Sequence, residues 1–148
     1  KEYKNSNITA IDVSQKAIMV AKKNIELNNL NDQITLKHLD LEDITNKYDV
    51  IVSNPPYIKI DDYVKLQVEI KNFEPKIALI GGDDGLKFYK KFSKKIDKLM
   101  FKKSIFICEI GHNQLPQIKK IFNNSNLTLK NITKDIQKID RTLTFLKI

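Results

Sequence analysis

Short apolar runs alternate with amphipathic segments along most of this chain, and this alternation constrains the fold more than any other feature. The runs are rich in β-branched residues and are short enough to be strands. Strands that alternate with helices form a mostly parallel sheet, so we predict an α/β fold. The last two runs have no helix between them, which predicts an antiparallel hairpin at one edge of the sheet. The predicted strands span residues 7–13, 34–36, 48–53, 104–110, 127–132 and 142–147.

Three helices are predicted from the spacing of their apolar side chains. The first begins at the N-cap residue Ser14 and ends near Asn28. The second follows the glycine-rich segment 81–85 and continues to Leu99, and the third has Pro116 in its first turn. Residues 58–80 are ambiguous, because their alternating apolar residues suit a half-buried strand whereas Pro75 and the acidic residues favour a folded excursion.

Composition excludes several classes of protein. The 148 residues carry a formal net charge of +8, but Arg141 is the only arginine among the 26 basic residues. Together with frequent Asn and Ile, this bias is typical of an AT-rich coding sequence, so the charge is weak evidence for a nucleic-acid partner. The single cysteine, Cys108, excludes a disulfide framework and a cysteine-based zinc site, and it favours a reducing, cytoplasmic location. The longest apolar runs are too short to span a membrane.

The sequence Asn54-Pro55-Pro56-Tyr57 stops the predicted strand 48–53 abruptly. We expect this strand to be buried, and strand 7–13 to be buried on both faces. Ligands of open α/β sheets bind beyond the carboxyl ends of the strands, so the position of this tetrapeptide suggests a functional site. Each proline has a fixed φ and restricts the residue before it, which makes the turn rigid.

Such a turn presents fixed hydrogen-bond acceptors to a planar NH₂ group. The side-chain oxygen of Asn54 and the backbone carbonyl of Pro55 are the natural pair to accept both hydrogens. Holding them would aim the nitrogen lone pair at an electrophile, while the ring of Tyr57 packs against the flat group. The alternative is a rigid surface turn with a buried asparagine and no catalytic role.

Two further acidic positions are candidates for cofactor binding. Asp12 lies near the end of the first predicted strand, where an acidic residue accepts hydrogen bonds from ribose hydroxyls in dinucleotide-binding folds. Asp40 and Leu41 follow the second strand and could bind an adenine amino group and cover its ring. Asp12 could instead only cap the helix that follows it. No metal site is predicted, because His38, His112 and Cys108 do not have the spacing of metal ligands.

Taken together, these segments resemble the class I methyltransferases that use S-adenosylmethionine, and more narrowly the HemK/PrmC-type protein-glutamine methyltransferases. The resemblance extends from Ile8 to Ile148. Asn-Pro-Pro-Tyr is shared with amino-methyltransferases of adenine, so the blocks downstream of it favour glutamine as the substrate. The matching segments are 11–14, 40–41, 52–58, 73–75, 78–79, 81–86, 109–111 and 140–141.

The resemblance implies S-adenosylmethionine as the cofactor and, as the substrate, the glutamine of a Gly-Gly-Gln segment in peptide chain release factors. It implies catalytic roles for Asn54, Pro55, Pro56 and Tyr57, and cofactor contacts from Asp12, Asp40, Leu41 and Asn54. We expect a monomer that does not bind a membrane. The alternatives are a glutamine methyltransferase of a ribosomal protein, an adenine methyltransferase acting on DNA or RNA, and an inactive fragment.

The chain departs from the family at its beginning. The family's first strand and glycine-rich cofactor loop should lie just upstream of Ile8, but residues 1–6 contain no glycine. The helical substrate-recognition domain is absent as well. We therefore expect residues 1–148 to form a partial catalytic domain that binds cofactor poorly alone, and whose sheet lacks the strand between strands 7–13 and 48–53.

Overall fold

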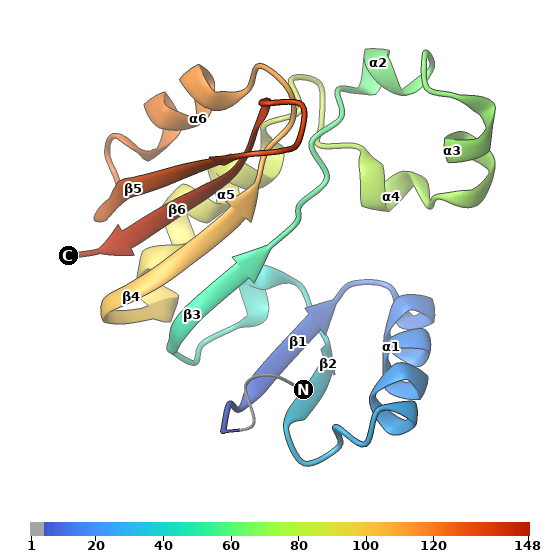
Figure 1. Ribbon diagram of the computed structural model, residues 1–148, viewed down its shortest axis with the longest axis vertical. Helices are drawn as coiled ribbons and strands as arrows, with labels where there is room; N and C mark the ends of the chain where they lie inside the picture. Colours follow the sequence, from blue (N-terminus) through green and yellow to red (C-terminus); the bar gives the residue numbers. More distant parts are fainter. Residues whose placement is uncertain (1–4) are drawn as a thin grey trace. The chain divides into compact units, whose positions relative to one another are not determined.

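The computed structural model describes residues 5–148, which belong to two compact units. The first unit ends at Thr45 and has the predicted strand–helix–strand order (Figure 1). Its two strands are parallel, with Ile8 opposite Ile34 and Asp12 opposite His38. Its elements are β1 (Ile8–Asp12), α1 (Gln15–Leu27), β2 (Ile34–His38) and a 3₁₀ turn (Leu41–Asp43).

The first unit confirms the predicted helix start but not the predicted burial of its first strand. The Ser14 side chain accepts a hydrogen bond from the backbone N–H of Ala17 at 3.3 Å, as an N-cap residue does. None of the residues of β1 is buried, and Ile8 is 44% exposed. The expectation that this strand is buried on both faces is therefore wrong. Within the unit, β1 has one neighbouring strand and a single helix to cover it.

The second unit, from Asn46 to Ile148, contains a mixed four-stranded sheet in the order β3-β4-β6-β5. The β3–β4 pair is parallel, and the other two pairs are antiparallel. The predicted C-terminal hairpin at one edge of the sheet is thus confirmed. The six strands within residues 5–148 form two separate sheets and not one seven-stranded sheet. The strands of the second unit are β3 (Tyr48–Ser53), β4 (Met100–Glu109), β5 (Leu127–Lys134) and β6 (Asp140–Lys147).

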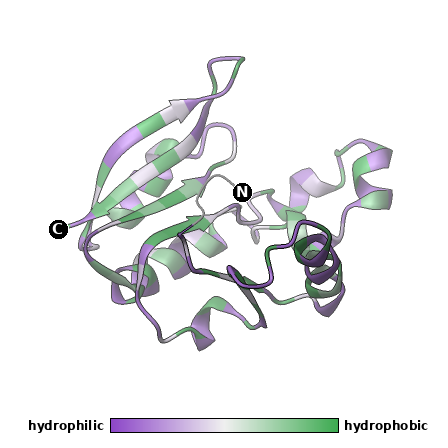
Figure 2. Ribbon diagram, turned by 60° about the horizontal axis from the view of Figure 1, so that its bottom comes forward, coloured by the Kyte–Doolittle hydropathy of each residue, from purple (hydrophilic) through white to green (hydrophobic). Residues whose placement is uncertain are grey.

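The core of the second unit lies between this sheet and the helices α5 (Lys87–Lys95) and α6 (Leu115–Phe122). In Figure 1, α5 lies behind the sheet and α6 is drawn next to β5, and hydrophobic segments of the strands and helices are green in Figure 2. Phe106 on β4 contacts Phe92, Phe122 and Phe145, and the rings of Phe122 and Phe145 stack at 4.4 Å between centroids. These aromatic contacts fix the helices to the sheet. Cys108 is fully buried among the core residues.

Strand β3 occupies an edge of its sheet, and its burial differs from the expectation. Val50 and Val52 expose 54% and 71% of their surface, so β3 is not the buried strand that was expected. Because β3 pairs only with β4 within its sheet, part of its surface is left uncovered by this unit. The strand nevertheless ends at Ser53, directly before the Asn-Pro-Pro-Tyr sequence, as predicted.

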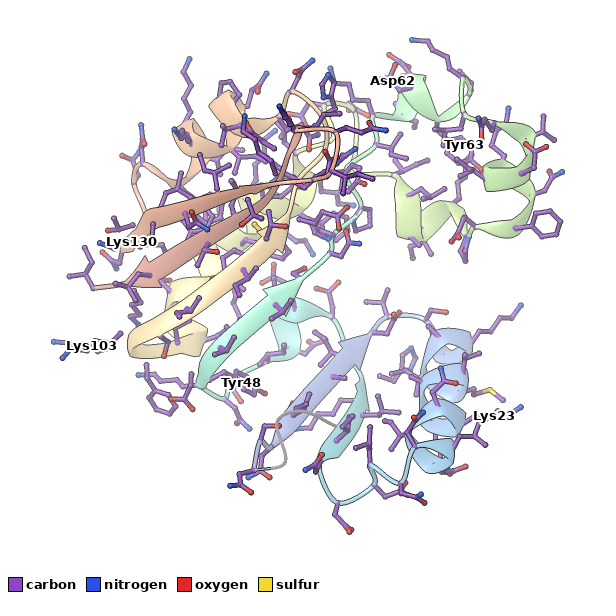
Figure 3. The ribbon with its side chains drawn as sticks, viewed as in Figure 1. Lys23, Tyr48, Asp62, Tyr63, Lys103 and Lys130 are labelled. Atoms are coloured by element: carbon purple, nitrogen blue, oxygen red, sulfur yellow. The ribbon has the colours of Figure 1, made fainter. Side chains whose placement is uncertain are left out.

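Residues 58–80 form a folded excursion with three short helices, which resolves the ambiguity of the sequence in favour of helix (Figure 1). Its two ends are joined by a parallel bridge between Ile58 and Ile80, which we call the neck. Within the excursion, the Lys76 ammonium lies 5.1 Å from the ring centroid of Tyr63, which is labelled in Figure 3. The helices are α2 (Ile60–Tyr63), α3 (Val68–Phe73) and α4 (Lys76–Leu79).

Residues 5–148 contain neither a membrane-spanning helix nor a cluster of metal ligands. None of the helices there is long and apolar enough to cross a membrane. In the same residues, no group of three or more His, Cys, Asp or Glu side chains is placed to hold a metal ion.

Candidate functional site

The Asn-Pro-Pro-Tyr turn, residues 54–57, begins where β3 ends. Asn54 is exposed, and its carboxamide has no hydrogen bond to any other residue in the described part of the chain. Pro55 is buried, whereas Pro56 and Tyr57 are half-buried. The turn therefore does not contain the buried asparagine that a purely structural role would predict. Instead it presents an amide group that is available to a ligand.

The phenol of Tyr57 is tied to the neighbouring strand. Its hydroxyl donates a hydrogen bond to Oε1 of Glu109, at 3.1 Å, and Glu109 is the last residue of β4. Burial raises the pKa of Tyr57 above its usual value of 10.0, and the hydrogen bond to Glu109 and the charge of that carboxylate raise it further. The phenol is therefore neutral near pH 7, and its ring has a defined orientation next to the turn.

The backbone carbonyl of Tyr57 is held by a second side chain. Nε2 of Gln114 donates hydrogen bonds to the carbonyl oxygens of Tyr57, at 3.0 Å, and Gly85, at 3.2 Å. Oε1 of the same amide accepts a hydrogen bond from the backbone N–H of Gly111 at 2.9 Å. Gln114 is only 8% exposed, so these contacts satisfy a buried amide.

Three of the four glycines approach the turn so closely that a side chain would displace it. A Cβ at Gly81 would lie 2.6 Å from the carbonyl oxygen of Pro56. One at Gly85 would lie 2.4 Å from the carbonyl oxygen of Tyr57, and one at Gly111 would lie 2.9 Å from its ring. These distances are shorter than real Cβ contacts. At Gly81 and Gly85 the nearest atoms are backbone oxygens, so the turn requires glycine there, whereas at Gly111 side chains of Gln114 and Tyr57 would have to move.

Asp12 and Asp40 lie in the first unit, at the carboxyl end of its two-stranded sheet. Oδ1 of Asp12 accepts a hydrogen bond from the backbone N–H of Ser14, the N-cap residue of α1, at 2.7 Å. The Asp40 side chain accepts a hydrogen bond from the backbone N–H of Glu42 at 3.2 Å and caps the 3₁₀ turn that Leu41 begins. Asp12 is exposed and can still accept further hydrogen bonds from a ligand.

The structure brings the predicted site residues together in two groups. Asn54, Pro55, Pro56 and Tyr57 are consecutive in the second unit, whereas Asp12, Asp40 and Leu41 share one edge of the first unit's sheet. Sequence reasoning did not identify Gln114 or the role of the glycines. A signal was available, since Gln114 lies in a polar segment that follows the carboxyl end of β4, next to the strand that leads to the turn.

The fold is that of the class I S-adenosylmethionine-dependent methyltransferases, which confirms the predicted fold class. A methyltransferase from Pyrococcus furiosus superposes with a TM-score of 0.70 at 22% identity, over 97% of this chain and 64% of that protein. The ribosomal protein L11 methylase from Lactobacillus delbrueckii superposes with a TM-score of 0.64 at 18% identity, over 94% of this chain and 56% of that protein. Residues 1–71 also match the family model of the methyltransferase small domain.

Within this class, the chain is related in sequence to the release factor glutamine methyltransferases, as its motifs predicted. It is 40% identical to the enzyme of that name from Fusobacterium nucleatum, over 96% of this chain and 41% of that protein. It is 38% identical to that from Thermodesulfovibrio yellowstonii, over 95% of this chain and 50% of that protein. The chain therefore spans about half of the length of these relatives, or less.

Replacing Tyr57 by phenylalanine tests the contact between the phenol and Glu109. We expect Tyr57→Phe to lower the free energy of unfolding by about 1 kcal/mol at pH 7, because a half-buried carboxylate loses its hydrogen bond. The folded-state pKa of Tyr57 is raised, so this stabilisation is complete below pH 10.0 and is lost as the pH rises through the folded-state pKa.

Urea denaturation of the full-length protein at several pH values measures this effect. The matched control is Tyr63→Phe in the excursion, which retains the ring under Lys76 and should leave stability unchanged. Equal stability of the two variants at pH 7 would contradict the prediction.

Proposed function

We propose that the protein transfers a methyl group from S-adenosylmethionine to the side-chain amide nitrogen of the glutamine in the Gly-Gly-Gln segment of peptide chain release factors. The observation on which the proposal rests is the exposed, unpaired carboxamide of Asn54 next to a rigid, buried proline at the carboxyl end of β3. The similarity to release factor glutamine methyltransferases supports this substrate over an adenine base. On this proposal, residues 1–148 belong to the catalytic domain.

The turn would act by orienting the substrate. The side-chain oxygen of Asn54 and the carbonyl oxygen of Pro55 would each accept one hydrogen of the glutamine NH₂ group. An amide nitrogen is a weak nucleophile because its lone pair is delocalised, so alignment of that lone pair is the main contribution that a protein can make. The neutral phenol ring of Tyr57 would line the pocket, and Pro56 would maintain the direction of the Pro55 carbonyl.

The residues of the first unit fit the adenosine part of the cofactor. When bound, S-adenosylmethionine supplies an electrophilic methyl group on a positively charged sulfur. The exposed carboxylate of Asp12 has acceptor capacity for ribose hydroxyls beyond its bond to Ser14. The carboxylate of Asp40 and the side chain of Leu41 are adjacent at the same sheet edge, and we assign them to the adenine. We also assign Asn54 to cofactor binding.

The proposal also covers the partner, the location and the oligomeric state of the protein. Its partner would be a release factor, and nucleic acid would be met only indirectly, because the relatives with curated names point to a protein substrate. A cytoplasmic location agrees with the single cysteine of the chain. A monomer is the expected state in solution, and light scattering of the full-length protein measures it.

The decisive experiment supplies labelled methyl donor to the full-length protein with a release factor, an adenine-containing oligonucleotide or ribosomal proteins. We expect label on the release factor and none when its Gly-Gly-Gln glutamine is replaced by glutamate. Label on the oligonucleotide alone would reject the proposal in favour of an adenine methyltransferase. Label on a ribosomal protein alone would retain the chemistry and replace the substrate.

A further inference from the structure

The buried amide of Gln114 connects three separate parts of the second unit. Its Nε2 reaches Tyr57 and Gly85, and its Oε1 reaches the backbone of Gly111. These residues follow β3, the excursion and β4 respectively. A single side chain thus fixes the relative positions of the Asn-Pro-Pro-Tyr turn and the two loops that flank it. Within residues 5–148, no buried side-chain nitrogen or oxygen lacks a partner, so the network is complete.

The position of the Tyr57 carbonyl is important for the acceptors that precede it. The ring of Pro56 fixes one of the torsion angles between the Pro55 carbonyl and the Tyr57 carbonyl, which limits how independently the two can move. Gly81 and Gly85 approach the backbone of Pro56 and Tyr57, so the turn cannot shift toward them. The bond from Gln114 holds the turn in place against these two glycines.

We infer that Gln114 is a positioning residue for methyl transfer. By holding the carbonyl of Tyr57, its amide determines the direction in which Asn54 and Pro55 present their oxygens to the substrate NH₂ group. Gln114 itself touches neither substrate nor cofactor in this assignment. The inference rests on the proposed function, because it concerns the geometry of the same transfer.

Two variants of the full-length protein separate positioning from folding. Gln114→Glu has the same length and retains an oxygen for the N–H of Gly111, but it loses the two N–H donors to Tyr57 and Gly85. Gln114→Met retains the approximate length of the side chain but makes none of these hydrogen bonds. We expect kcat for methylation of the release factor to fall about a hundredfold in both variants, because a small misplacement of reacting groups has effects of this size.

Comparing the effect of each substitution on kcat with its effect on cofactor affinity identifies the role of Gln114. The dissociation constant for S-adenosylhomocysteine should stay within about tenfold of the wild-type value, since Gln114 acts on the turn. Circular dichroism at the assay temperature establishes that each variant is folded. The matched control is Gln137→Met, which replaces an exposed glutamine near the tip of the β5–β6 hairpin and should leave kcat unchanged.

The outcomes distinguish this inference from the proposed function. Failure of the wild-type protein to label the release factor would reject the proposed function. An active wild type together with wild-type kcat in folded Gln114→Glu would overturn the positioning role alone. If Gln114→Met does not fold, Gln114→Glu decides the matter, because it retains the contact with Gly111.

Discussion

Replacing Asn54 by alanine is expected to lower kcat for methyl transfer by about a hundredfold to a thousandfold, which would abolish activity in an ordinary assay. The exposed carboxamide of Asn54 makes no hydrogen bond to another residue of the described chain, so its removal should change the free energy of unfolding little. The substrate NH₂ group would lose one of the two acceptors that orient its lone pair. Transfer to the release factor in a single-turnover assay with saturating methyl donor measures the loss.

The controls for Asn54→Ala separate chemistry from binding and folding. The affinity for S-adenosylhomocysteine should remain within about tenfold of the wild-type value, because the main role assigned to Asn54 is orienting the amide. Asn124→Ala removes an equally exposed carboxamide at the end of α6 and should be fully active. Loss of the folded state in Asn54→Ala would favour the alternative of a purely structural turn, and undiminished kcat would remove Asn54 from the site.

A methyl group at Gly85 should have the largest effect on stability. The new Cβ would lie 2.4 Å from the carbonyl oxygen of Tyr57 and 2.7 Å from Nε2 of Gln114. The φ angle of Gly85 is +72°, so the backbone conformation is also unfavourable for alanine. We expect Gly85→Ala to lower the free energy of unfolding by about 3 kcal/mol or more, since overpacking and backbone strain add.

Gly82 provides the matched control for this prediction. Its φ of +91° is equally unfavourable for alanine, but a Cβ there would meet only the Lys87 side chain, no closer than 3.2 Å. Gly82→Ala should therefore lower the free energy of unfolding by only about 1 kcal/mol, because backbone strain is the sole contribution. Urea denaturation of the full-length protein, followed by circular dichroism, compares the two variants. Similar losses in both would show that crowding at the turn contributes nothing.

Local sequence signals predicted the order and approximate bounds of the strands and long helices. Ser14, Pro116 and the apolar spacing of the helices act within a few residues, and the structure agrees with them. The helix predicted through Leu99 becomes a 3₁₀ turn after Lys95. Burial was predicted less well, because it depends on how many strands and helices surround β1 and β3. A run of β-branched residues does not contain that information.

The candidate site was predicted only where the local sequence restricts the backbone conformation. Two consecutive prolines after a strand indicate a rigid turn from local geometry alone. By contrast, the roles of Gln114 and Gly85 arise from contacts between segments far apart in the sequence, and no local pattern specifies them. The crowding of three glycines around the turn arises in the same way, from contacts between distant segments.

The neck of the excursion has a consequence for how such proteins diversify. Three backbone hydrogen bonds close it, from Ile58 to Leu79, from Gly81 to Ile58 and from Ile60 to Gly82. The chain therefore leaves and re-enters the sheet region at a fixed point, whatever lies between. Doubling the length of a closed loop costs only about 0.6 kcal/mol of conformational entropy. Residues 61–72, which lie between the closed ends and outside the segments that resemble the family, can thus be lengthened or shortened while the neighbouring turn keeps its geometry.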